Sequence, residues 1–387
     1  MRVQSHTKLT TLVLILIAQV SAFSQNVYFP SAANWKTSSA KKQGFNEAQL
    51  AKAIDFAKAN EYKGDRDLRI PIAKAYVREP YFKIVGPTKE RGGPAGIIVR
   101  HGYIVAQWGD VERADMTFSV TKSYLATIAG LAVDEGLIKD THDKVNTYVN
   151  DTTFASEHNS KITWHHLLTQ SSDWSGNLFG MYDWADRPPK EGTIEDWKNR
   201  TLVEPGTVYE YNDVRVNLLA YSLLRVYQKP LPVVLKEKIM DPIGASSTWN
   251  WYGYETSKVK IKGVDIESVS GGGHSGGGLF INTLDHARFG LLFARNGNWN
   301  GKQLISTKWI GQMTQSSGAN SAYGYLWWLN RGNEKWEGLS EDIFYANGFG
   351  GNFIVVDKAH DLVIVLRWLE PSKLEEMMKQ VFTAIDK

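Results

Sequence analysis

Phe118-Ser119-Val120-Thr121-Lys122-Ser123 is the stretch of sequence that decides the fold, because a long helix with an apolar face begins there. Apolar residues return at every third or fourth position along this helix: Leu125, Ile128, Ala129, Ala132 and Val133. Gly136 is the expected end of the helix. The spacing therefore predicts a buried helix that carries Ser119 and Lys122 in its first turn.

Strands are predicted near both ends of the chain. Residues 96–100 and 103–108 are rich in β-formers and are separated by the turn pair His101-Gly102. Further strands are expected at 323–329, 351–357 and 361–368, whereas residues 140–250 are mostly helical in pattern. This order indicates an α+β fold, with a sheet built from both chain ends, flanking helices and an inserted helical lobe.

The domain boundaries follow from the same pattern. We expect an irregular lead-in at 25–45 and one domain over 46–387. Its α/β lobe would comprise about 46–137 and 270–387, and its helical lobe about 138–269. A composition of 43% hydrophobic and 22% charged residues is ordinary for a globular protein. The formal net charge is only +3 and no basic run stands out, so no nucleic-acid partner is expected.

Residues 1–24 have the pattern of a secretory signal peptide. Arg2 and Lys8 precede a short apolar stretch, and small residues before Gln25 suit cleavage. The alternative is a retained membrane anchor, which the shortness of the apolar stretch disfavours. We therefore expect a periplasmic or secreted protein with no stable membrane anchor after cleavage. The chain has no cysteine, which excludes disulfides and a lipid anchor on cysteine.

Serine and lysine three residues apart on a helix suit nucleophilic acyl transfer. One helical turn places the lysine beside the serine hydroxyl, where it can accept a proton or stabilise an alkoxide. The bare S-x-x-K pattern occurs five times, starting at Ser5, Ser38, Ser39, Ser119 and Ser257. Only Ser119 opens a long helix directly after a strand pair. The alternative is that Ser119 merely caps a core helix and Lys122 is solvated.

Tyr211 is the second candidate for proton transfer. It lies in Pro205-Gly206-Thr207-Val208-Tyr209-Glu210-Tyr211-Asn212-Asp213, a turn that leads into a helix with Asp213 as the expected N-cap. A tyrosine at such a junction can face a cleft and act as acid or base. The alternative is an ordinary core tyrosine.

Taken together, these segments resemble class C β-lactamases, D-alanyl-D-alanine carboxypeptidases and related esterases. The resemblance covers roughly residues 90–370 and includes the helix at Ser119, the segment 162–172, the box 204–213, the segment 279–290 and Gly348-Phe349-Gly350-Gly351. It is closest to the 6-aminohexanoate-dimer hydrolase and carboxylesterase-like branch, through Asp173-Trp174, the run 183–187 and Trp249-Asn250-Trp251. It implies the β-lactamase/transpeptidase-like fold, whose sheet is antiparallel.

The resemblance also implies roles for residues. Ser119 would attack, Lys122 and Tyr211 would move protons, and the backbone N–H groups of Ser119 and of Tyr345 would form the oxyanion hole. Asp213 and Gly348 would border the substrate. Three aromatic residues are further candidates for the wall of the substrate site: Trp174, Tyr182 and Trp184.

Two departures from the family pattern bear on the substrate. Asp213 stands where the family usually has asparagine, and an ionised carboxylate cannot donate a hydrogen bond. No K-[ST]-G triad precedes Gly348, and the corresponding place holds Ile343, Phe344 and Tyr345. In the family that lysine helps to bind a substrate carboxylate. Its absence favours a neutral small-molecule or short-peptide ester or amide over a β-lactam.

Other functions are also compatible with these segments. A β-lactamase or carboxypeptidase-like enzyme, a penicillin-binding sensor that barely deacylates, and an inactive interaction module would all carry similar segments. Gly273-His274-Ser275-Gly276-Gly277 also fits the nucleophile-elbow pattern G-x-S-x-G, but a glycine-rich loop surrounds Ser275, and His274 is expected to be a loop side chain near the cleft. His165 and His166 are adjacent and lack ligand spacing, so neither a metal nor another cofactor is expected.

Overall fold

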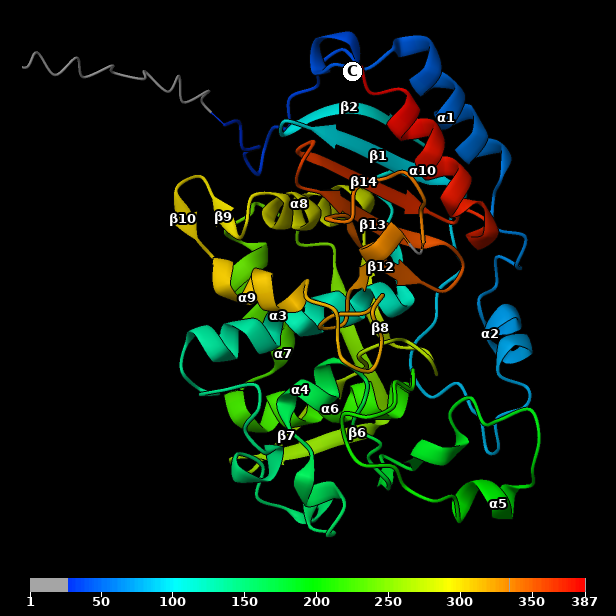
Figure 1. Cartoon of the computed structure of the whole chain (residues 1–387), viewed down its shortest axis with the longest axis vertical. Helices are drawn as coiled ribbons and strands as arrows, with labels where there is room; N and C mark the ends of the chain where they lie inside the picture. Colours follow the sequence, from blue (N-terminus) through cyan, green and yellow to red (C-terminus); the bar gives the residue numbers. More distant parts are fainter. Residues whose placement is uncertain (1–26, 334, 387) are drawn as a thin grey trace, which may run out of the picture.

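The structure is a computed structural model that describes residues 27–333 and 335–386 (Figure 1). The predicted signal peptide therefore lies outside the described residues. Within the described ranges, no helix has the length and apolar character needed to cross a membrane.

A six-stranded antiparallel sheet forms the upper half of the molecule in Figure 1, with strand order β11-β12-β13-β14-β1-β2. Its strands are β1 (Ala95–Arg100), β2 (Tyr103–Trp108), β11 (Trp328–Leu329), β12 (Phe344–Gly348), β13 (Asn352–Asp357) and β14 (Leu362–Arg367). The first and last parts of the chain meet where β1 pairs with β14, with Ala95 opposite Arg367. The prediction of an α+β fold with an antiparallel sheet from both chain ends is confirmed.

The turn between β1 and β2 explains why that hairpin was readable from sequence. His101 and Gly102 both have positive φ, 52° and 83°, as a two-residue hairpin turn requires. The predicted strand at 323–329 is wrong in length, because only Trp328 and Leu329 pair with β12.

Helices cover both faces of this sheet, so β1, β13 and β14 are buried throughout. Helices α1 (Glu47–Ala59) and α10 (Leu374–Thr383) pack together on one face (Figure 1). Helix α8 (Thr283–Ala294) lies against β14, β13 and β1 on the other face. Apolar side chains on both faces exclude water and provide most of the stabilisation.

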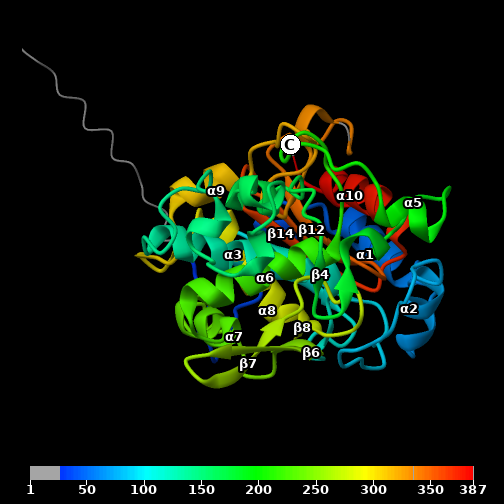
Figure 2. The ribbon, with the colours of Figure 1, turned by 90° about the horizontal axis from the view of Figure 1, so that it is seen from below.

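Residues Thr121 to Ala132 of helix α3 (Thr121–Asp134) are all buried. The helix packs against α6 (Asp213–Tyr227), and the two helices lie side by side in Figure 2. The shorter elements are α2 (Arg69–Ala75), α4 (Trp164–Leu168), α5 (Ile194–Lys198), α7 (Leu231–Leu235), α9 (Thr307–Met313), β4 (Asn177–Leu178), β5 (Met181–Tyr182), β9 (Asn298–Trp299) and β10 (Lys302–Gln303).

The segment predicted as a helical lobe ends in two strands. β6 (Asn250–Ile261) and β7 (Val264–Val269) form a hairpin, which joins β8 (Gly278–Ile281) and β3 (Asp115–Met116) in a second sheet of order β3-β8-β6-β7. β3 and β8 matter for the site, because they position the residues just before Ser119.

The described part of the lead-in, residues 27–45, lies against the domain. The Trp35 indole N–H donates to the carbonyl oxygen of Gly102 at 2.8 Å, and Thr37 bridges to Ile104. The Arg288 guanidinium donates to the carbonyl oxygen of Ser31 at 2.8 Å. These contacts hold the segment in place, although its composition looked irregular.

Candidate active site

Ser119 lies at a sharp turn between β3 and α3. It is the middle residue of a single 3-10 turn, Phe118–Val120, which leads directly into α3. Phe118 has φ 49°, a left-handed conformation that is rare for a bulky residue. Its buried ring packs against Phe349 with 5.1 Å between centroids. The packing of Phe118 therefore holds the turn and leaves Ser119 half-buried at the start of the helix.

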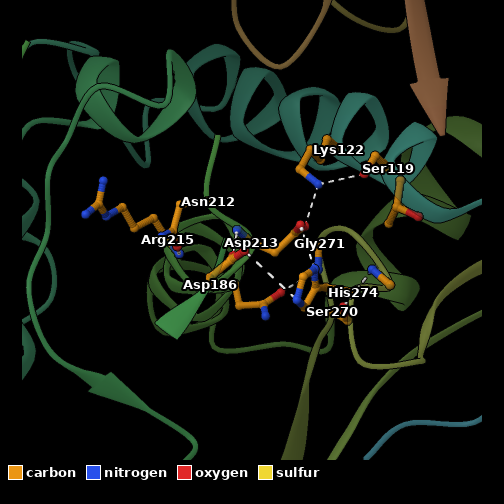
Figure 3. A network of polar contacts seen from close by, with 12 residues as sticks. Ser119, Lys122, Asp186, Asn212, Asp213, Arg215, Ser270, Gly271 and His274 are labelled. Atoms are coloured by element: carbon orange, nitrogen blue, oxygen red, sulfur yellow. Dashed lines mark hydrogen bonds and ion pairs between the residues drawn. The ribbon is translucent and has the colours of Figure 1, made fainter. Parts of the chain in front are cut away.

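Lys122 is fully enclosed one turn after Ser119. Its Nζ donates to Ser119 Oγ at 2.9 Å and to Asp213 Oδ1 at 2.5 Å (Figure 3). Burial lowers the pKa of the ammonium group, but the nearby charge of Asp213 outweighs burial and holds this pKa above its usual value. Lys122 is therefore an ammonium ion in the resting protein.

Tyr211 joins the same cluster. Its ring lies 4.6 Å from Lys122 Nζ and 5.2 Å from the Arg187 guanidinium, measured to the ring centroid. The structure thus brings together the three residues predicted to be catalytic, although Ser119 and Lys122 lie at the start of α3 and Tyr211 lies just before α6. Tyr211 is half-buried, so its edge is reachable from outside.

The expected N-cap of α6 was wrong by one residue. Asn212 is the N-cap, and its side-chain oxygen accepts from the backbone N–H of Arg215 at 3.1 Å. Asp213 is the first helical residue, and its carboxylate points to Lys122 instead of to the helix terminus. The cap leaves Asp213 free to pair with cations.

Asp213 has three cationic partners. Besides Lys122, Arg187 Nη2 donates to Oδ2 at 2.7 Å, and His274 Nδ1 lies 3.4 Å from the same oxygen. Burial raises the pKa of the carboxyl group, but Lys122 and Arg187 outweigh this and hold the pKa well below its ordinary value. The negative charge of Asp213 is therefore balanced by neighbouring cations.

His274, Glu79 and Asp186 complete the network and were not predicted as part of the site. His274 Nε2 lies 2.6 Å from Glu79 Oε2 and 4.0 Å from Asp186 Oδ1. Burial lowers the pKa of His274, but Asp186, Asp213 and Glu79 raise it more, to about 9. His274 lies on the loop between β7 and β8 and lines a cavity, as predicted, but its burial inside a charged network was not expected.

The glycine-rich run 271–278 was the sequence signal for this close approach. A Cβ on Gly272 would lie 1.9 Å from Asp213 Oδ1 and 2.4 Å from Lys122 Nζ. Only glycine leaves room for the backbone beside these two charged groups. The run therefore marks where the loop that carries His274 passes Lys122 and Asp213.

Ser275 is not placed as a nucleophile. It is buried, and its carbonyl oxygen accepts from the backbone N–H groups of Val85 at 2.9 Å and Gly86 at 3.0 Å. A nucleophile elbow requires a strand before the serine and a helix after it. Here a loop precedes Ser275 and the strand β8 follows, so the alternative pattern lacks its structural context.

Glu79, Asp186 and His274 are also close enough to suggest a cation site, with one candidate ligand atom from each within 4.8 Å of the others. However, Arg187 Nη1 binds Asp186 Oδ1 at 2.5 Å, the other Asp186 oxygen accepts from the backbone N–H of Asp213, and Glu79 is already bound to His274. These donor atoms satisfy one another and do not fit a metal ion.

The family model described as Beta-lactamase matches residues 89–368. The chain belongs to the Beta-lactamase family. Members of this family are mostly serine hydrolases, and the suspected serine hydrolase superfamily is confirmed.

The chain is also similar to individual proteins. A proposed penicillin-binding protein of Bacillus subtilis, PbpX, is 25% identical over 297 residues, which covers 71% of this chain and 72% of that protein. A proposed 6-aminohexanoate-dimer hydrolase from Bacillus anthracis has a TM-score of 0.55 at 15% identity, over 93% of this chain and 98% of the other. EstCE1, a hydrolase with promiscuous acyltransferase activity, has a TM-score of 0.58 at 15% identity, over 88% and 99%. At such identities the solved structures establish the fold.

The predicted wall residues of this Beta-lactamase family member divide into two groups. Trp174 is buried in the core, where its indole N–H donates to the carbonyl oxygen of Thr153 at 2.9 Å, so it is not a wall residue. Tyr182 and Trp184 stack with 5.2 Å between centroids near the exposed Tyr81. Tyr182 borders a cavity of about 400 Å³, which Glu79, Asp186 and His274 also line.

Gly348 lies against the Ser119 turn, since a Cβ there would be 2.2 Å from the carbonyl oxygen of Thr117. Tyr345, three residues earlier, pairs with Trp328 on one side and Val355 on the other. Its oxyanion role stays a prediction. The pairing favours a donor nearer Gly348, because β11 leaves the edge of β12 open beyond Tyr345 in the described part of the chain.

Proposed function

We propose that this chain is a serine hydrolase that cleaves an ester or amide bond through a covalent acyl-enzyme at Ser119. One observation carries the proposal: Ser119 Oγ, half-buried at the start of α3, lies 2.9 Å from the Nζ of an enclosed lysine. A hydroxyl beside a buried cation at a helix N-terminus is favourably placed to attack a carbonyl carbon, because both features stabilise negative charge.

The roles of the two proton-handling residues differ in this proposal. Lys122 is charged at rest, so it stabilises the attacking oxygen and does not accept the proton. Tyr211 reacts in its phenolate form: it takes the proton of Ser119 and gives it to the leaving group, which restores the phenolate. A water molecule then attacks the acyl group, and Tyr211 accepts the proton of this water and returns it to Ser119 Oγ as the acyl product leaves. The backbone N–H of Ser119 and one from the open edge of β12 near Gly348 receive the oxyanion.

A neutral substrate is favoured by the charges at the site. Lys122 and Arg187 are the cations next to Tyr211, and both are paired with Asp213. No lysine lies on β12, where the related β-lactamases carry the K-[ST]-G triad. With no free cation among these groups to receive a carboxylate, we propose an uncharged ester or linear amide.

A second candidate function has one observation in its favour. The similarity to a proposed penicillin-binding protein over 71% of the chain supports a β-lactamase or carboxypeptidase-like activity, or an acylated sensor that barely turns over. A chromogenic short-chain ester separates these from the first proposal. Steady turnover that is absent in Ser119→Ala supports the hydrolase, and a single stoichiometric burst supports the sensor. Turnover of a cephalosporin or of D-alanyl peptides, but not of esters, supports the peptidase-like alternative.

We also propose that the protein is exported through the sequence at 1–24. The mass of the mature protein, purified from the periplasm or medium of an expressing cell, tests this. An N-terminus at or near Gln25 is expected, whereas an intact Met1 in the cell membrane supports the anchor.

A further inference from the structure

We propose that His274 is a positioning residue: clamped by Glu79, its imidazolium fixes the Asp213 carboxylate so that one oxygen is presented to Lys122 beside Ser119. This role rests on the proposed function. His274 does not contact Ser119 itself. The role would explain why Glu79 and the glycine-rich run 271–278 lie beside the charged network.

The contacts of His274 run in one line toward the nucleophile. Glu79 Oε2 lies 2.6 Å from Nε2, and Nδ1 on the opposite edge of the ring lies 3.4 Å from Asp213 Oδ2. The other oxygen of Asp213 receives Lys122 Nζ at 2.5 Å, and that Nζ donates to Ser119 Oγ (Figure 3). Movement of the imidazole would therefore change how Asp213 holds the lysine.

Two aromatic rings pack against the imidazole of His274. Tyr76 lies 3.8 Å away between ring centroids, and Phe82 meets the ring edge-to-face at 5.6 Å. The Glu79 carboxylate is itself anchored, since its second oxygen accepts from the backbone N–H of Arg187 at 3.1 Å. Nε2 is hydrogen-bonded to Glu79, and Nδ1 has an ion-pair contact with Asp213 but no hydrogen bond, so Glu79 sets the orientation of the ring toward Asp213.

The segment that carries Glu79 is tied to the loop that carries His274. Val85 and Gly86 donate to the carbonyl oxygen of Ser275, and Gly277 donates to the carbonyl oxygen of Pro87 at 2.8 Å. These hydrogen bonds join the segment that follows Glu79 to the loop that carries His274. The backbone thus helps to set the distance between Glu79 and His274 independently of their own hydrogen bond.

Charge balance supports the same role. The network contains three anions, Glu79, Asp186 and Asp213, and three cations, which are Lys122, Arg187 and His274. Arg187 spans Asp186 and Asp213, so without the imidazolium the anions of the cluster would outnumber the cations. In a buried cluster an unmatched charge is costly, and Asp213 would turn or take up a proton.

The test compares the pH profile of kcat/KM for a chromogenic ester in wild type, Glu79→Gln, His274→Asn and the double variant. Removal of the Glu79 charge weakens the hold of His274 on its proton, because the pKa of a group falls when an adjacent opposite charge is lost. We expect the alkaline decline of Glu79→Gln to begin at least about one pH unit lower than in wild type. His274→Asn should lower kcat/KM by about 10-fold to 100-fold, the range found when groups that orient metal ligands are removed.

The double variant should behave like His274→Asn alone, because Glu79 acts through the imidazole. The matched control is Asp140→Asn, which removes the carboxylate from the exposed pair of His142 and Asp140 and should leave the profile unchanged. The positioning role alone is overturned if wild type turns over the ester but the alkaline decline of Glu79→Gln stays where it is in wild type. The same holds if the effects of the two substitutions add in the double variant. A wild type that neither turns over ester nor reacts with a fluorophosphonate overturns the proposed function and this role together.

Discussion

The buried His274 makes a quantitative prediction about stability and pH. Its folded pKa is raised to about 9 from the ordinary value of 6.5. The sign follows from linkage: a raised pKa adds stability that is fully present below pH 6.5 and is lost as the pH rises through about 9. The difference between the two values corresponds to about 3 kcal/mol, because one pKa unit is worth about 1.4 kcal/mol.

The assay is equilibrium urea unfolding at pH 6.0 and pH 9.5, with wild type compared to His274→Asn. Between these two values, wild type should lose about 3 kcal/mol more of its free energy of unfolding than the variant does. His142→Asn is the matched control, because His142 is exposed beside Asp140 and should follow wild type. Equal pH dependence in wild type and His274→Asn would refute the reasoning, since it would mean that His274 is not a buried cation at neutral pH.

Three further predictions concern the reacting groups. Ser119→Ala should abolish ester turnover. In urea unfolding it should change the free energy of unfolding by no more than about 1 kcal/mol, since one hydrogen bond is lost. Lys122→Ala and Tyr211→Phe should each lower kcat by a factor of about 10² to 10⁴ in the same assay, as expected for a lost acid, base or charge partner; rates near wild type would exclude the assigned roles. Gly348→Ala would place a Cβ 2.2 Å from the carbonyl oxygen of Thr117, two residues before Ser119, and should abolish labelling by a fluorophosphonate. The control Gly311→Ala, with open space around its Cβ, should be labelled like wild type.

Local patterns made part of this site readable from the sequence. Ser119 and Lys122 are three residues apart in one helix, so the helical period alone brings their side chains together. The hairpin of β1 and β2 follows equally from the backbone preferences of its turn. Tyr211 is far along the chain, and its place beside Lys122 was expected only from the resemblance to a known family.

The rest of the network could not be derived because it depends on long-range packing. Glu79, Arg187 and His274 come from three separate loops, and no periodicity links them to Asp213. Trp174 was expected at the substrate because it is aromatic, yet burial in the core satisfies the same side chain. Two features of the sequence do point to the network. Asp213 stands where asparagine was expected, and its charge needs matching cations. The glycine run 271–278 leaves room for the backbone beside these charged groups.

Mapping the covalent adduct tests the central claim most directly. The protein is treated with a fluorophosphonate, digested, and the modified peptide is sequenced by mass spectrometry. The account predicts one stoichiometric adduct on Ser119. In Lys122→Ala this adduct should form more slowly or not at all. An adduct on Ser275, or a wild type that remains unmodified while the folded protein is intact, would contradict it.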